Sequence, residues 1–187
     1  MIFAFILALQ IAQAEDPQLL LGRWEQDCYE HKQKTEVFYP EHVSFFENYY
    51  VDDRCNQALF TFKSTGAYSL PGPANVDLGT EKMDFRFEQV EVLLKRQDLV
   101  DQFNAEKTCG FSDWVINEAK DITALLCDFF SSAKPVHIPA AGEMRYGIYK
   151  MAGDELYLGR LTLNQNGRSE GTRPTDLDLS PYLKINP

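Results

Sequence analysis

The sequence predicts a mainly β fold: a strongly bent antiparallel sheet or β-barrel with one short α-helix. About eight or nine short segments are rich in aromatic and β-branched residues and are separated by turn residues. Only residues 96–107 carry apolar side chains at a clear helical spacing. No repeat or linker divides the chain, so we expect these elements to form one domain.

The N-terminal residues have the pattern of a cleavable signal peptide. An uncharged apolar run from Ile2 to Ile11 leads into Ala12-Gln13-Ala14, the small-x-small pattern that signal peptidase accepts. The run is shorter than the roughly 20 residues of a membrane-spanning helix. We expect residues 1–14 to be removed and residues 15–187 to form a single β-barrel-like domain. No Lys or Arg precedes the run, and the alternative is a buried N-terminal strand or helix.

The cysteine content supports an exported protein. All four cysteines lie after the expected cleavage site, and an even number in an exported chain predicts two disulfides. Three pairings exist for four cysteines. We favour Cys28–Cys55 and Cys109–Cys127 because each of these pairs closes a local loop. The expected location is the periplasm or the extracellular medium, and the lack of an Asn-x-Ser/Thr sequon is consistent with a bacterial origin.

Alternation of apolar and polar residues predicts the strands in the first half of the chain. Residues 35–39 and 42–51 are rich in aromatic and β-branched types, and residues 19–27 are expected to form a turn and a first strand. Residues 58–70 alternate with one break. Pro71-Gly72-Pro73 is expected to end that strand.

Residues 82–94 have the clearest strand pattern. Met83, Phe85 and Phe87 point to one face, and the charged residues between them point to the other. This pattern is typical of an antiparallel sheet with water on one side. The alternation then changes phase, which predicts a β-bulge near Glu88-Gln89.

A helix is predicted over residues 96–107, where Leu99, Val100 and Phe103 form a narrow apolar stripe and Cys109-Gly110 follows as an end signal. The other expected elements are a strand within 121–130, a hairpin of 144–151 and 155–163 around Gly153-Asp154, a mobile loop over 164–172 and a last strand within 177–185.

Charge and motifs exclude several classes of function. The net charge is −10, which argues against nucleic acid and anionic lipid headgroups as partners. The chain contains no G-x-S-x-G, H-E-x-x-H or P-loop motif, so we expect no enzyme and no cofactor. His31, His42 and His137 are far apart in sequence and no C-x-x-C occurs, so we expect no metal site.

A set of short motifs, in order, resembles the adenomatosis polyposis coli down-regulated protein family. The most specific are Gly22-x-Trp24 followed by Cys28, Tyr50-x-Asp52-x-x-Cys55, and Gly66-x-Tyr68. Later segments that fit the same outline are Gly79-Thr80, Phe85–Leu93, Asp98-Leu99-Val100, Cys109-Gly110, Trp114, Asp121-Ile122-Thr123, Gly153–Gly159 and Arg173-Pro174-Thr175-x-Leu177.

The resemblance covers most of residues 19–185 and implies a lipocalin-like β-barrel domain with an apolar cavity. It also implies the Cys28–Cys55 pair. Animal members antagonise Wnt signalling with tandem copies, a role that does not carry over to this single copy. Lipocalins are the main alternative family, because Gly22-x-Trp24 is also the motif with which they begin. Their helix follows the barrel, however, whereas residues 96–107 lie in the middle of this chain.

Aromatic residues on the predicted strands are the candidate ligand-binding residues. In a barrel, side chains that face inward can line a cavity for an apolar group, and Tyr hydroxyls at its opening need polar partners. The alternative is that these rings fill a solid core, and Trp24 is expected to plug one end of the barrel in either case. The candidates are Trp24, Tyr68, Phe85, Tyr146, Tyr149 and Tyr157.

These observations predict an exported binding protein whose barrel holds an apolar small molecule or acyl chain. The alternative is an envelope protein-interaction module with a solid core, whose exposed loops bind a protein partner and which holds no small molecule. An internal cavity distinguishes the two hypotheses.

Overall fold

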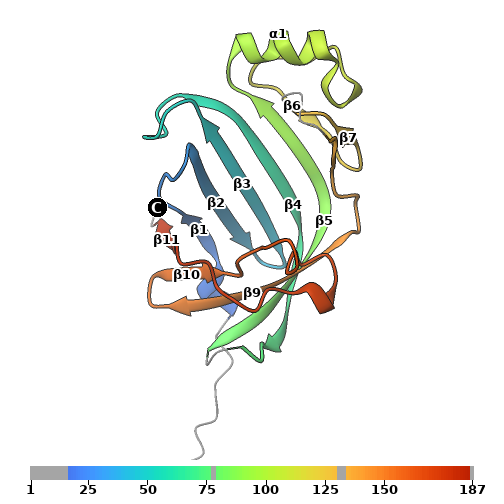
Figure 1. Cartoon of the computed structure of the whole chain (residues 1–187). Coiled ribbons are helices and arrows are strands. Elements are labelled where there is room, and N and C mark those ends of the chain that lie inside the picture. Colours follow the sequence, from blue (N-terminus) through green and yellow to red (C-terminus); the bar gives the residue numbers. More distant parts are fainter. Residues whose placement is uncertain (1–16, 77–78, 130–133, 186–187) are drawn as a thin grey trace, which may run out of the picture.

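The computed structural model describes residues 17–76, 79–129 and 134–185. The predicted barrel is confirmed: eight antiparallel strands form a closed ring in the order β1-β2-β3-β4-β5-β9-β10-β11 and back to β1. Figure 1 shows these strands curving around one interior. The expected signal peptide lies outside the described residues. The ring strands are β1 (Gly22–Glu25), β2 (Lys32–Tyr39), β3 (His42–Tyr50), β4 (Ala58–Pro73), β5 (Thr80–Leu94), β9 (Met144–Ala152), β10 (Glu155–Leu158) and β11 (Tyr182–Ile185).

One long insertion, residues 95–143, interrupts the ring between β5 and β9. It contains α1 (Gln97–Glu106), the short strand β6 (Ala119–Asp121), which pairs with β5, and the two-residue strands β7 (Leu126–Cys127) and β8 (Val136–His137), which pair with each other. Figure 1 shows α1 beyond one end of the barrel, with β6 and β7 beside that end of β5. The insertion therefore lies where it can form one side of the barrel opening.

The phase change predicted in β5 is confirmed as a β-bulge. Phe87 pairs with Gly66 of β4 and Gln89 pairs with Thr65, so Glu88 has no partner of its own. Because of the extra residue, odd-numbered side chains face the core before the bulge and even-numbered side chains face it after the bulge. The buried residues are Met83, Phe85 and Phe87 before the bulge and Val90, Val92 and Leu94 after it.

The predicted end of β4 at Pro71-Gly72-Pro73 is wrong, because the strand continues through Pro73. The register shifts between Ser69 and Gly72, and pairing resumes where Gly72 meets Lys82. Proline lacks a backbone N–H and is tolerated in a strand at such an irregularity. Pro71 therefore interrupts the hydrogen-bond ladder without ending the strand.

The predicted helix is present, and its apolar stripe of Leu99, Val100 and Phe103 is buried. It ends before Cys109-Gly110, because Lys107 has the left-handed backbone conformation that stops a helix. Phe103 packs edge-on against Trp114, with ring centroids 5.3 Å apart. The helix is thus anchored to the rest of the insertion.

The remaining elements differ mainly in length from the expectation. The β9–β10 hairpin turns at Gly153-Asp154, but its second strand ends at Leu158. Where one strand was expected within 121–130, the structure has the end of β6 and the short strand β7, because residues 122–125 between them leave the sheet in a turn. The segment 159–181 between β10 and β11 contains a short 3₁₀ helix, η3 (Glu170–Thr172), and a second, η1 (Pro17–Leu20), precedes β1.

Both expected disulfides are present in the structure. Cys28–Cys55 joins the chain before β2 to the turn between β3 and β4, and its Cα atoms are 5.9 Å apart. Cys109–Cys127 lies within the insertion and joins the end of α1 to β7. No helix in the described part of the chain is long and apolar enough to cross a membrane.

Candidate functional site

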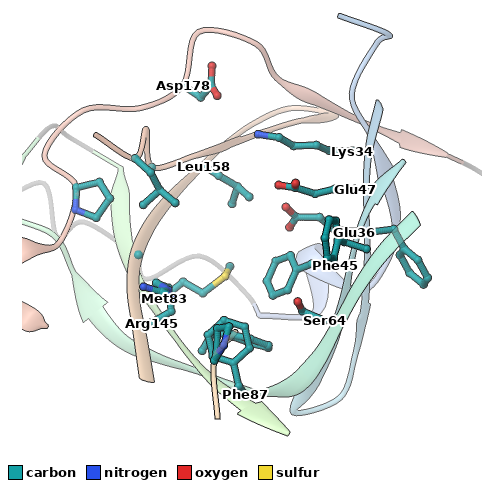
Figure 2. Close-up of a pocket in the computed structure, with 18 of the residues that line it drawn as sticks. Lys34, Glu36, Phe45, Glu47, Ser64, Met83, Phe87, Arg145, Leu158 and Asp178 are labelled. Atoms are coloured by element: carbon teal, nitrogen blue, oxygen red, sulfur yellow. The ribbon is translucent and has the colours of Figure 1, made fainter. Parts of the chain in front are cut away.

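A cavity of about 630 Å³ lies inside the barrel. Its walls come from strands β2 to β5, from β9 to β11, and from two segments outside the ring. One of these is the part of the insertion that contributes Phe129 and Val136–Pro139, and the other is the segment that follows β10. Figure 2 shows the side chains projecting from the surrounding strands toward a shared space.

Phenylalanine rings form the apolar wall of this cavity. Phe85 contacts Phe45 and Phe87 edge-on, with ring centroids 4.8 Å and 4.7 Å apart. Phe62 of β4 meets Phe129 of the insertion in the same way at 5.1 Å. Edge-to-face contacts fix the orientation of rings beyond what burial alone does. The rings therefore hold one another in place around the cavity.

Charged side chains line another part of the cavity, next to Phe45. Lys34 and Glu36 alternate along β2 onto the inner face, and Glu47 lies directly across from Lys34 on β3. Figure 2 shows the ends of all three side chains pointing into the cavity from one wall. The Glu47 carboxylate also accepts a 2.9 Å hydrogen bond from the Tyr49 hydroxyl. The cavity thus combines a group of charged side chains with an aromatic wall, and the two meet where Glu36 pairs with Phe45.

Glu36 is the most deeply buried acidic group on this wall, with only 3% of its surface exposed. The Tyr182 hydroxyl of β11 hydrogen-bonds to its carboxyl group. Burial raises the pKa of Glu36 to about 8, while Tyr182 and the nearby Lys34 ammonium act to lower this pKa and the Glu47 carboxylate to raise it. Burial also raises the pKa of Tyr182 well above 10. Both groups are therefore largely protonated at neutral pH.

The cavity reaches the surface between the insertion and the segment after β10. Val136 and Leu161, one on each side, line the cavity and are 47% and 60% exposed. Arg173 holds the second segment against the barrel by donating from Nη1 to the carboxylate of Asp84 and to the carbonyl of Gly147, both at 2.6 Å. The opening therefore has exposed apolar residues on both sides, and the exposed Arg160 lies beside Leu161.

Of the residues predicted from the sequence, Phe85 and Tyr146 are among those that line the cavity. Phe85 lies in the aromatic wall described above. The Tyr146 ring packs against the Arg173 guanidinium, whose carbon is 5.3 Å from the ring centroid.

The other four predicted residues are not among those lining the cavity. Trp24 is fully buried and donates from Nε1 to the Leu20 carbonyl at 2.7 Å. Tyr149 is a buried core residue. The Tyr157 hydroxyl donates to Glu155 at 2.7 Å, and Tyr68 packs edge-on against Phe38 at 5.4 Å.

Glu36 and Tyr182 also line the cavity, and the strand pattern did not predict them. The sequence does contain a clue to the burial of Glu36. Glu36 lies on the same face of its strand as Phe38, and Val37 lies on the other face. Alternation alone does not say which of these faces is inside the barrel. Tyr182 lies on a short strand whose register depends on β1 and β10.

Within the residues described, no group of three or more His, Cys, Asp or Glu side chains is placed to hold a metal ion. His31 and His42 each lie beside one exposed carboxylate, Asp53 and Glu88. No family model matches the chain, and no curated protein matches it in sequence. The resemblance to the adenomatosis polyposis coli down-regulated protein family stays a prediction.

Proposed function

We propose that this chain is an exported binding protein that holds an apolar or lipidic ligand inside its barrel. The observation that carries the proposal is the cavity of about 630 Å³ with its wall of phenylalanine rings. Its volume lies within the range of roughly 300–1,000 Å³ that is typical of small-molecule sites. Eight-stranded barrels are wide enough to hold one small ligand.

Burial supplies the binding energy in this proposal. Each methylene group that moves from water to the aromatic wall contributes about 0.8 kcal/mol, so an acyl chain gains affinity with length. The internal cavity supports this hypothesis over an interaction module with a solid core. Two disulfides support the export part of the proposal, because such bonds persist in oxidising compartments.

Two measurements test the proposal. Protein purified without detergent is extracted with organic solvent, and the extract is analysed by mass spectrometry for apolar molecules present in stoichiometric amount. The emptied protein is then titrated with a fluorescent fatty-acid analogue. We expect saturable binding, and a protein that carries no ligand and binds no analogue contradicts the proposal.

A matched pair of variants locates the binding site. Ser64 lies on the inner face of β4 between Phe45 and Val90, whereas its neighbour Thr65 points to the other face. We expect Ser64→Trp to fill the cavity and abolish analogue binding, and Thr65→Trp to bind like wild type. Circular dichroism and thermal unfolding establish that both variants are folded. Equal binding by both folded variants contradicts an internal site.

A further inference from the structure

The carboxyl group of Glu36 has an unused hydrogen-bonding atom inside the cavity. Its Oε2 atom is buried and has no hydrogen-bond partner among the described residues, although Tyr182 hydrogen-bonds to the same carboxyl group. Buried polar atoms are nearly always paired in folded proteins. Figure 2 shows this carboxyl group directed toward the cavity, which Glu36 helps to line.

Charges of both signs lie around Glu36, and Arg145 of β9 lines the same cavity. On β2, the Lys34 ammonium is near enough to stabilise a Glu36 carboxylate, and the Glu47 carboxylate on β3 opposes it. The Asp178 carboxylate, just before β11, raises the pKa of Tyr182, as the Glu47 carboxylate also does. A ligand bearing one full charge thus faces a group of like sign as well as one of opposite sign. A neutral polar group avoids that repulsion.

Burial also determines the role of Glu36 in hydrogen bonding. Because its pKa is raised to about 8, the carboxyl group carries its proton at neutral pH. Tyr182 donates a hydrogen bond to one carboxyl oxygen of Glu36. The proton of Glu36 is therefore expected on the other oxygen, the unpaired Oε2. The missing partner is therefore a hydrogen-bond acceptor.

We propose that Glu36 is the polar anchor of the cavity and that the ligand is an amphiphile whose head presents a neutral accepting oxygen, such as an ester or ketone carbonyl. This inference rests on the proposed function, because it concerns the ligand of the same cavity. The head of the ligand lies beside Glu36 and Tyr182, and its tail lies along the wall formed by Phe85 and Phe87. The exposed Val136 and Leu161 at the opening offer apolar contacts to the far end of this tail.

The test compares methyl dodecanoate with dodecane on wild type and on Glu36→Leu. Affinities are obtained by displacement of the fluorescent probe N-phenylnaphthylamine. We expect Glu36→Leu to weaken binding of the ester about 3- to 10-fold, the size of one neutral hydrogen bond, and not to weaken binding of dodecane. Comparing the two ligands separates loss of the hydrogen bond from a change in cavity shape.

Glu36→Gln provides a second measurement that does not depend on the folding of the leucine variant. Its amide N–H₂ still donates, so we expect ester affinity close to that of wild type at pH 6.5. Between pH 7 and pH 9.5 the wild type should lose ester affinity as Glu36 loses its proton, whereas Glu36→Gln should not. Glu88→Gln, on an exposed part of β5 outside the cavity, should follow wild type throughout.

The outcomes separate the inference from the function on which it rests. If Glu36→Leu weakens ester and dodecane equally, or if ester affinity of the wild type is constant up to pH 9.5, the anchor is wrong and the apolar site stands. If dodecylamine or dodecanoate binds more tightly than the ester and loses that advantage in Glu36→Gln, the head group is charged and the inference is overturned. If none of the ligands displaces the probe, the proposed function fails as well.

Discussion

The guanidinium of Arg173 and the carboxylate of Asp84 form an ion pair, with Nη1 and Oδ1 2.6 Å apart, between segments far apart in the sequence. Both side chains are largely buried, with exposed fractions of 9% and 15%. Arg173 lies in the segment that forms one side of the cavity opening, and Asp84 lies on β5. The pair therefore fixes the position of that segment relative to the barrel.

Removing Arg173 is expected to destabilise the protein. Arg173→Met leaves the Asp84 carboxylate buried without its partner, and breaking such a pair costs about 3 kcal/mol or more. Urea unfolding of Arg173→Met, Asp84→Asn and the double variant measures the loss and the coupling between the two residues. Additive effects of the two substitutions would mean that the pair does not hold the segment in place.

Glu36 should make stability fall as pH rises. The folded protein holds the Glu36 proton up to a pKa of about 8, whereas the ordinary value is 4.5. The stabilisation is therefore complete below pH 4.5 and is lost as pH rises through 8, because the folded state must then bury a charge. The difference between these two pKa values corresponds to on the order of 5 kcal/mol in the free energy of unfolding.

The measurement is urea unfolding of wild type and Glu36→Gln from pH 4.5 to pH 9. The difference between the two proteins removes the pH effects that are common to both. We expect wild type to lose stability relative to Glu36→Gln over this range. Parallel curves would show that Glu36 titrates normally in the folded protein.

Strand pattern alone predicted much of the barrel, because each strand has its own signal. On β5 the alternation of Met83, Phe85 and Phe87 and its phase change at Glu88 are visible in the sequence, and the structure contains both. The closing pair of the ring, β1 with β11, is not visible there. That pairing joins distant segments, and nothing local in Tyr182–Ile185 specifies its partner.

The cavity could be predicted only in part for a related reason. Phe85 was found because its strand has one apolar and one charged face. Glu36 was missed because both faces of its strand carry bulky apolar residues, Val37 and Phe38, so the pattern does not identify the inner face. Its environment depends on Tyr182 and Glu47, which come from two other strands.

Gly66 should not tolerate any side chain. A Cβ atom at this position would lie 2.0 Å from the Arg86 carbonyl oxygen and 2.9 Å from the Phe85 ring, where β4 meets the bulge of β5. We expect Gly66→Ala to cost about 3 kcal/mol or more, because strands as well as side chains must move. Gly171→Ala is the control, since its Cβ would meet nothing closer than the Ser169 hydroxyl at 4.0 Å. Equal unfolding midpoints would contradict this prediction.

Each disulfide should contribute a similar amount to stability. The bridged cysteines are 27 residues apart for Cys28–Cys55 and 18 for Cys109–Cys127. Loop closure in the unfolded chain then gives about 3–4 kcal/mol for each bond. Replacing one pair at a time by serine and measuring urea unfolding tests this expectation.

The second pair should also affect ligand binding. Phe129 of the aromatic wall lies two residues after Cys127, so its position depends on the bond to Cys109. We expect the Cys109→Ser, Cys127→Ser variant to bind the fluorescent analogue more weakly, and the Cys28→Ser, Cys55→Ser variant to bind like wild type when both are folded. Unchanged binding in the first variant would show that the insertion keeps its place without the bond.

The pairing of β1 with β11 sets the order in which the chain can fold. Trp24 pairs with Glu36 of the next strand, but its other neighbour, Lys184, is made only after β3, β4, β5, the insertion, β9 and β10. Until then β1 has an open edge, and such an edge is prone to pair with other molecules. A chain without β11 therefore remains an incomplete sheet, and a factor that shields this edge would raise the yield of folded protein.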